Sequence, residues 1–164
     1  MKTLCVRPEW AMPITVGMKT VECRTWRTKY RGDLLICSSA RKTDGCVCGS
    51  GLCVVSLDSI EPFTKKHLFS AVMEADDMPD DAYAWILTNC RMVEPFPVKG
   101  RLNLFEVPDE DIHIIGEPTP ELVERYLLPL VHRSKDSTAE DMWLWVYAEM
   151  DWPWTSSAEA ALNG

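Results

Sequence analysis

An ammonium group, a carboxylate and a guanidinium lie within six residues of one another in this chain, at Lys19, Glu22 and Arg24. Two residues on the same face of a strand are separated by about 7 Å, so Glu22 and Arg24 could bracket a single ligand between them. Lys19, two residues after Gly17, could close a third side. The alternative is that Glu22 and Arg24 pair only with each other and stiffen the backbone.

The element that must position these groups is a strand. Between residues 20 and 26, small or β-branched residues alternate with larger or charged ones, which is the period of a half-buried strand. We expect Val21, Cys23 and Thr25 to face a core. The other face is then shared by Glu22, Arg24 and Trp26.

Two ordered blocks of sequence carry a family resemblance. Gly17 to Arg24 has the spacing GxKxxExR, preceded by Pro8-Glu9-Trp10-Ala11 and followed by Tyr30-Arg31-Gly32 and Leu34-Leu35-Ile36. A second block runs from Ala82-Tyr83-Ala84-Trp85 to Pro97-Val98-Lys99-Gly100-Arg101 and on to Phe105. Together, over roughly residues 3–107, they resemble an activating signal cointegrator homology (ASCH) domain of the PUA-like superfamily.

The resemblance implies a mainly β fold with some α structure (α+β), a small PUA-like β-barrel with flanking helices. It also implies a cleft around GxKxxExR that binds RNA or a nucleotide-like ligand. Such sites combine cations for phosphate, aromatic rings for stacking and acceptors for base edges. The candidate binding residues are Trp10, Lys19, Glu22, Arg24, Trp26, Lys29, Tyr30, Arg31 and Ser38. Trp10 has a simpler alternative role in core packing.

A hydrolase acting at the same cleft is the alternative function. Some relatives resemble amidohydrolases of acylated cytidine, with a lysine and a threonine nucleophile three residues later. Here Lys19 is present but Glu22 occupies the threonine's place, and a carboxylate does not replace a lysine-activated alkoxide. Others resemble ribonucleases that use a lysine and a tyrosine, for which Lys19, Lys29 and Tyr30 are available. The catalytic candidates are therefore Lys19, Glu22 and Tyr30.

We expect neither a metal nor a cofactor. Cys46, Cys48 and Cys53, with Cys37 nearby on an adjacent strand, lack the usual C-x₂₋₄-C zinc spacing, so free thiols are the better interpretation. The three histidines are scattered, and no glycine-rich phosphate loop of the Walker or Rossmann type occurs.

Composition indicates a cytoplasmic protein of one domain with an extension. The chain has 164 residues, seven cysteines without a secretory signal, and no apolar run long enough for a membrane helix. Its net charge of −8 is unevenly distributed. Residues 1–43 carry nine bases and three acids, whereas the remaining 121 residues carry eight bases and 22 acids. A local basic site is therefore compatible with the acidic total.

The remaining pattern predicts short strands joined by turns. We expect strands at 4–6, 33–39, 52–63, 83–96 and 102–107. A short helix should run from Pro8 to Val16 and end at Gly17, beginning near Trp10 so that Pro13 falls in its first turn. A second helix is expected over residues 64–75.

We place a domain boundary at residue 108. Residues 1–108 form the predicted barrel domain, and residues 109–164 form an acidic, tryptophan-rich helical extension with twelve acids and three bases. Helices are expected from Thr119 to about His132 and from Thr138 to Met150. The second helix should pack on the barrel; alternatively it shields the basic cleft, and the extension could also contact a protein partner.

Overall fold

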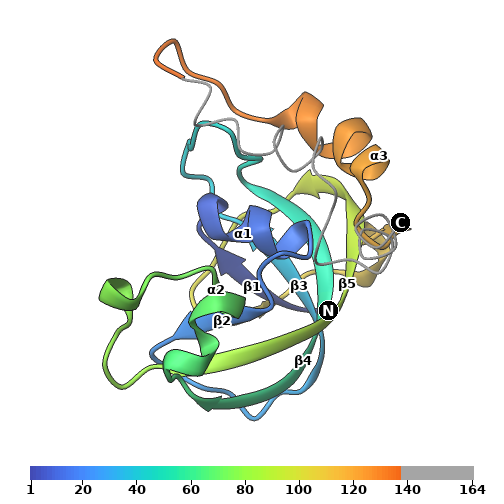
Figure 1. The fold of residues 1–164 in the computed structure, drawn as a ribbon. Helices are drawn as coiled ribbons and strands as arrows, with labels where there is room; N and C mark the ends of the chain where they lie inside the picture. Colours follow the sequence, from blue (N-terminus) through green and yellow to red (C-terminus); the bar gives the residue numbers. More distant parts are fainter. Residues whose placement is uncertain (138–164) are drawn as a thin grey trace, which may run out of the picture.

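The computed structural model describes residues 1–137, which form a curled, mixed sheet with short helices at its margins (Figure 1). The strands are β1 (Lys2–Val6), β2 (Val21–Arg24), β3 (Gly32–Ser38), β4 (Ser50–Pro62), β5 (Tyr83–Pro97), β6 (Leu104–Glu106) and β7 (Ile114–Gly116). They are ordered β2-β5-β4-β3-β1-β6, and β7 pairs with β5. This curled half-barrel with a few short helices confirms the predicted α+β class.

The two longest strands curl the sheet. The register between β4 and β5 shifts at three points, and Asn89 within β5 has a left-handed φ of 52°. Irregularities of this kind bend a strand and increase its twist, so one continuous strand can serve two parts of a barrel. All pairs are antiparallel except β1 with β3.

Helix α1 (Pro8–Thr15) lies across the opening of the curled sheet (Figure 1). Its first residue is a proline, which suits a position with no hydrogen-bond partner for an amide. The expectation that the helix begins near Trp10 is wrong, since Pro13 lies inside the helix rather than in its first turn. The helix ends at Thr15, and Gly17 follows its C-cap residue with the expected left-handed φ, 83°. The amides of Met18 and Lys19 then both donate to the carbonyl of Pro13.

The helix predicted over residues 64–75 is broken. A 3₁₀ turn (Lys65–His67) leads into the four-residue α2 (Leu68–Ala71), and Val72 then adopts a left-handed φ of 54°. The Met73 amide returns to the carbonyl of Leu68, which closes the helix end. A separate 3₁₀ turn follows at Ala75–Asp77.

The main core fills the half-barrel beneath α1. It includes Met12 and Ile14 of the helix together with Leu34, Trp85 and Met92 of the sheet. A smaller cluster on the other side of β2 contains Val21, Phe63, Ala71, Ala82 and Ala84. One face of strand β2 is therefore packed on this smaller cluster, through Val21 and Cys23, and its charged side chains, Glu22 and Arg24, lie on the other face.

The described part of the extension packs against the sheet. Thr119 caps α3 (Pro120–Leu122), its side chain accepting a hydrogen bond from the Leu122 amide. A π-helical turn (Val123–Leu127) and a 3₁₀ turn (Leu128–Leu130) continue it. Val123, Leu127 and Leu128 belong to the main core. The helix predicted from Thr138 to Met150 lies outside the described residues. Within residues 1–137, no helix is long and apolar enough to cross a membrane.

Candidate functional site

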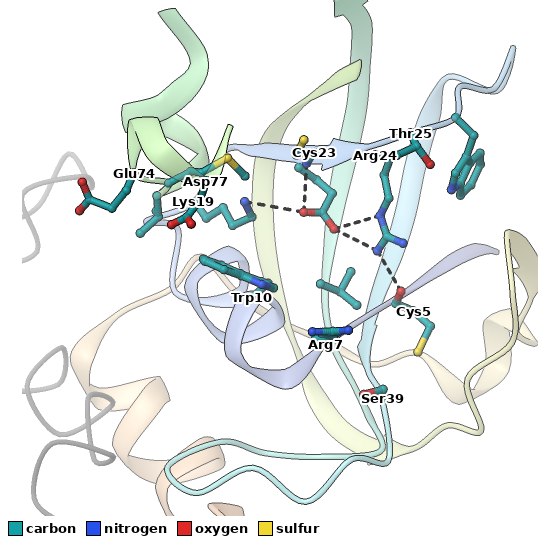
Figure 2. A pocket seen from close by; sticks show the side chains of 15 residues that line it. Cys5, Arg7, Trp10, Lys19, Cys23, Arg24, Thr25, Ser39, Glu74 and Asp77 are labelled. Carbon is teal, nitrogen blue, oxygen red and sulfur yellow. Dashed lines mark hydrogen bonds and ion pairs between the residues drawn. The ribbon is translucent and has the colours of Figure 1, made fainter. Parts of the chain in front are cut away.

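A hollow of about 650 Å³ opens between the start of α1, strand β2 and the turn after α2; we call it the first cleft (Figure 2). Its lining is Cys5, Val6, Arg7, Trp10, Lys19, Glu22, Cys23, Arg24, Thr25, Trp26, Ser39, Val72, Met73, Glu74 and Asp77. Five of the nine predicted binding residues are therefore brought together here: Trp10, Lys19, Glu22, Arg24 and Trp26.

Glu22 is the centre of a hydrogen-bonded array. Its Oε2 accepts from Arg24 Nε at 3.2 Å and from Arg24 Nη2 at 3.0 Å. Its Oε1 accepts from the Cys23 amide at 3.2 Å and lies 3.7 Å from Lys19 Nζ. A carboxylate offers about four lone-pair directions, and Glu22 uses three for hydrogen bonds from protein donors, with the Lys19 ion pair beside them. Glu22 therefore holds the two cations in place rather than offering an acceptor to a ligand.

Lys19 is almost fully buried, with its side chain 2% exposed. Its Nζ donates to the carbonyl of Ala71 at 2.6 Å, at the end of α2, and lies 5.1 Å from the centre of the Trp10 ring. Burial lowers the pKa of Lys19, and the nearby carboxylate of Glu22 opposes part of that change. An ammonium group has three donors, so after Ala71 and Glu22 one remains for a ligand.

Arg24 links the edge strand β2 to β1, the last strand but one on the far side of the curled sheet. Its Nη2 donates to the carbonyl of Cys5 at 3.0 Å, which links β2 to β1 although the two strands do not pair. Its Nη1 forms no hydrogen bond or ion pair with any other described residue. With Nε and Nη2 fixed by Glu22 and Cys5, the guanidinium presents Nη1 in a set orientation beside the cleft (Figure 2).

Two indole rings supply the apolar surface of the cleft. Trp10, in α1, lies with its ring beneath the ammonium group of Lys19. Trp26 contacts the fully buried Trp85 edge-on, with ring centres 4.8 Å apart, and its carbonyl accepts a hydrogen bond from Trp85 Nε1. Both Trp10 and Trp26 are partly exposed while packing against the main core. Both hypotheses for Trp10, core packing and cleft lining, therefore describe part of its environment.

The charges lining the first cleft balance. Three bases (Arg7, Lys19 and Arg24) face three acids (Glu22, Glu74 and Asp77). Arg7 is exposed just before α1, whereas Glu74 and Asp77 lie on the opposite rim, after α2. A multiply charged anion would gain little from the cleft as a whole. The balance instead favours a ligand that carries its charge near the arginines and an apolar or hydrogen-bonding part elsewhere.

Four predicted residues do not line this cleft. The hydroxyl of Tyr30 donates to the carbonyl of Asp33, and Arg31 Nη1 donates to the carbonyls of Thr28 and Tyr30. Lys29 is exposed. Ser38 is fully buried and exchanges hydrogen bonds with the backbone of Ser50.

The sequence did not single out several residues that line the cleft. Ser39 takes the position expected of Ser38, because side chains of successive strand residues point to opposite faces. Arg7 could have been found from the sequence, because it is a base directly before the proline that begins α1. Glu74 and Asp77 fell within or beside a predicted helix, and only the break at Val72 turns them towards the cleft.

Cys5 is the acidic thiol of the cleft. A hydrogen bond with Cys37, its neighbour on β3, lowers the pKa of Cys5 to about 7, and Arg24 acts in the same direction. The same hydrogen bond, together with burial, raises the pKa of the Cys37 thiol. Burial and the negative charge of Glu22 raise the pKa of Cys23.

No group of three or more metal-ligating side chains is assembled within the described 1–137 region. Cys37, Cys46 and Cys53 are buried, Cys48 is half-buried, and none of the four forms a disulfide within the described residues. The Cys46 and Cys48 pair lies in the loop before β4, where the Cys48 thiol contacts the carbonyls of Thr43 and Cys46.

Comparison with known proteins finds a family match over the part of the chain that contains the first cleft. The family model described as ASCH domain matches residues 4–97, more than half of the chain. Activating signal cointegrator 1 of Homo sapiens is 28% identical over 138 residues, covering 67% of this chain and 22% of that protein. The chain thus spans about a fifth of that relative. The crystal structure of ASCH from Zymomonas mobilis superimposes with a TM-score of 0.53 at 16% identity, covering 67% of this chain and 89% of that one.

Proposed function

The chain belongs to the ASCH domain family, and from that premise and the geometry of the first cleft we propose that it binds RNA or a nucleotide-like ligand there. One observation carries the proposal. Lys19 and Arg24 are fixed on either side of Glu22, each with donor capacity left over, in a cleft with two partly exposed indole rings. Cationic donors beside aromatic surfaces are the usual elements of a site for single-stranded nucleic acid.

In this proposal each residue has a separate task. Arg24 Nη1 and the remaining Lys19 donor bind a phosphate oxygen or an acceptor on a base edge. Trp10 and Trp26 provide surfaces for base stacking, a contact worth about 1–3 kcal/mol per base. Glu22 is a positioning residue, because its own oxygens are already occupied by Cys23, Lys19 and Arg24.

The site favours a nucleotide over a simple phosphate ion. A phosphate-only site would be small and would carry an excess of bases, whereas this cleft has a volume of about 650 Å³ and balanced charge. The volume is within the usual range for small-molecule pockets, which are mostly apolar with a few fixed polar groups. A base together with its sugar phosphate fits this description.

Hydrolysis at the same cleft is a second candidate function, and the burial of Lys19 favours it. A lysine whose pKa is lowered is closer to the range in which it can act as a general base. The position that would hold the amidohydrolase nucleophile is Glu22, whose oxygens face four donors. The described structure therefore leaves Lys19 as the candidate with the strongest physical support.

The test compares two arginines on the same stretch of chain. Arg24→Ala should weaken binding of a single-stranded RNA oligonucleotide about 10- to 100-fold, because a hydrogen bond to a charged group contributes about 1.5–3 kcal/mol. Arg27→Ala is the matched control: Arg27 is exposed, contacts the Tyr83 ring and does not line the cleft. Binding is followed by fluorescence anisotropy at two salt concentrations, with circular dichroism to verify folding.

Two outcomes would contradict the proposal. One is a folded wild-type protein that binds neither RNA nor nucleotides at low salt. The other is an equal loss of affinity in both variants, which would indicate general electrostatic attraction rather than a site. Turnover of RNA or of acylated nucleosides by the wild type, abolished in Lys19→Met, would instead support the hydrolase.

A further inference from the structure

A second hollow of about 570 Å³ adjoins the first cleft. We call it the second groove; its lining is Leu4, Cys5, Arg24, Trp26, Ser39, Ala40, Lys99, Gly100, Arg101, Leu102 and Asn103. Four residues line both hollows: Cys5, Arg24, Trp26 and Ser39. The two hollows are therefore neighbours, with Arg24 and Trp26 between them.

The second groove has an excess of positive charge. Arg24, Lys99 and Arg101 line it and no acidic residue does, in contrast to the balanced first cleft. Lys99 and Arg101 are exposed, and neither forms an ion pair or a hydrogen bond with any other residue of the described chain. Lys99 and Arg101 also line a third hollow, on another side of this loop, together with Glu106 and Asp111. The two cations therefore lie between that hollow and the acid-free second groove, which adjoins the first cleft.

The loop that carries Lys99 and Arg101 is fixed against the floor of the site. A Cβ atom at Gly100 would lie 2.4 Å from Cys5 Sγ, so only glycine allows the loop to approach β1 this closely. Asn103 returns the chain to β6 with a left-handed φ of 58°. Leu102, between Arg101 and Asn103 in the same loop, is 90% exposed. The loop thus holds two free cations and an apolar side chain beside Trp26.

We propose that the second groove binds backbone phosphates that flank the nucleotide held in the first cleft, so that the ligand is single-stranded RNA of two or more nucleotides. This inference rests on the proposed function. A free nucleotide would leave the second groove empty, although its unpaired cations favour a polyanion. A duplex keeps its bases stacked on one another, so none would be available to Trp10 and Trp26. An extended single strand can place one base in the cleft and its neighbouring phosphate between the two hollows.

The experiment uses the full chain and two RNA probes, a nucleoside monophosphate and a single-stranded hexanucleotide. Lys99→Ala/Arg101→Ala should bind the monophosphate as the wild type does and the hexanucleotide about 10-fold more weakly. Each single-strand phosphate contact contributes about 0.7 to the slope of log affinity against log salt, so this slope should fall by about 1.4. Lys99→Arg/Arg101→Lys should restore most of the binding.

The matched control is Lys65→Ala/Lys66→Ala, which also removes two exposed positive charges but from a turn that lines neither hollow. This variant should bind both probes like the wild type. The inference is overturned if the wild type binds the hexanucleotide no more tightly than the monophosphate, or if the two double variants lose hexanucleotide affinity equally. Absence of binding to both probes would overturn the proposed function itself, and unchanged binding by Lys99→Ala/Arg101→Ala would overturn only the groove.

Discussion

Glu22 shows how a buried carboxylate can organise a site that it does not itself offer to a ligand. Its side chain is 7% exposed and stands between Lys19, which is 2% exposed, and Arg24, which is 24% exposed. Removing one partner of a buried ion pair leaves an uncompensated charge, which is more costly than the loss of a surface pair. The array should therefore be both the electrostatic centre of the cleft and a point of structural weakness when mutated.

We expect Glu22→Gln to lower the free energy of unfolding by about 3 kcal/mol, because Lys19 and Arg24 would lose the anion that compensates their burial. Glu106→Gln is the matched control. Glu106 pairs with Lys2 at a similar distance of 3.1 Å, but its side chain is 63% exposed, so the change should stay within about 1 kcal/mol. Urea denaturation measures both. Equal losses in the two variants would contradict the buried array.

The Cys5 thiol provides a pH-dependent signal from the same cleft. Its pKa is lowered to about 7, chiefly by the hydrogen bond with Cys37. Since the thiolate is the reactive form, iodoacetamide should label Cys5 at a rate that rises through pH 7 and levels off above it. Cys23 is also half-buried but has a raised pKa, so its labelling should still increase above pH 9. Peptide mass spectrometry follows both residues in one sample.

Cys37→Ala should remove the hydrogen bond and move the Cys5 midpoint towards its ordinary value near 9. Identical pH profiles for Cys5 and Cys23 in the wild type would contradict the arrangement. So would an unchanged Cys5 midpoint in Cys37→Ala.

At the scale of single residues, the sequence predicted part of the lining of the first cleft but not all of it. Lys19, Glu22 and Arg24 were identified from their types and spacing, and the structure joins them. Alternation cannot tell what the second face of a strand adjoins, and here it lines the first cleft opposite the start of α1. The sequence prediction named Ser38, but the serine that lines the cleft is its neighbour Ser39. Lys29, Tyr30 and Arg31 were included because they are near in sequence, but the turn after Trp26 carries them away from the cleft.

At the scale of elements, strands were predicted better than helices. The positions of β1, β3, β4 and β5 follow from runs of apolar or alternating residues bounded by turn formers, and each lies close to its expected range. The predicted helix over residues 64–75 failed because helical spacing of Leu68, Ala71, Val72 and Ala75 says nothing about backbone hydrogen bonds. The Met73 amide bonds to Leu68 instead, and Val72 turns left-handed.

That local break has a functional consequence. Because α2 stops at Ala71, the carbonyl of Ala71 is free to accept the Lys19 ammonium group. A helix continuing to residue 75 would direct this carbonyl towards the amide of Ala75. The element that was predicted least accurately is thus the one that fixes Lys19. Local sequence could not predict where α2 ends, because Ala71 is held by long-range packing in the small core beneath β2.

At the scale of the whole molecule, the charge asymmetry of the sequence indicated a basic site but assigned it to too small a region. Residues 1–43 supply Arg7, Lys19 and Arg24 to the first cleft. The second groove draws Lys99 and Arg101 from the acidic remainder of the chain. Strand order explains the difference, because β6 pairs with β1 and brings the preceding loop beside Cys5.

The extension provides the last prediction, because its described part is built into the barrel core. Strand β7 pairs with β5, and Val123 and Leu127 are fully buried in the main core. Burying a large aliphatic side chain contributes about 1.5–3 kcal/mol, so residues 109–137 supply several such contributions beside the backbone pairing. His132 also exchanges backbone hydrogen bonds with Gly45 and Cys46 in the loop before β4.

Truncation after Pro108 should therefore produce a chain that unfolds or aggregates at temperatures where the full chain is native, because the exposed core surface and the unpaired side of β5 favour association. A chain truncated after Ser137 is the control, since it retains every one of these contacts. Thermal melts and size-exclusion chromatography distinguish them. If the chain ending at Pro108 is monomeric, melts like the one ending at Ser137 and binds RNA more tightly, the extension shields the cleft instead of completing the core.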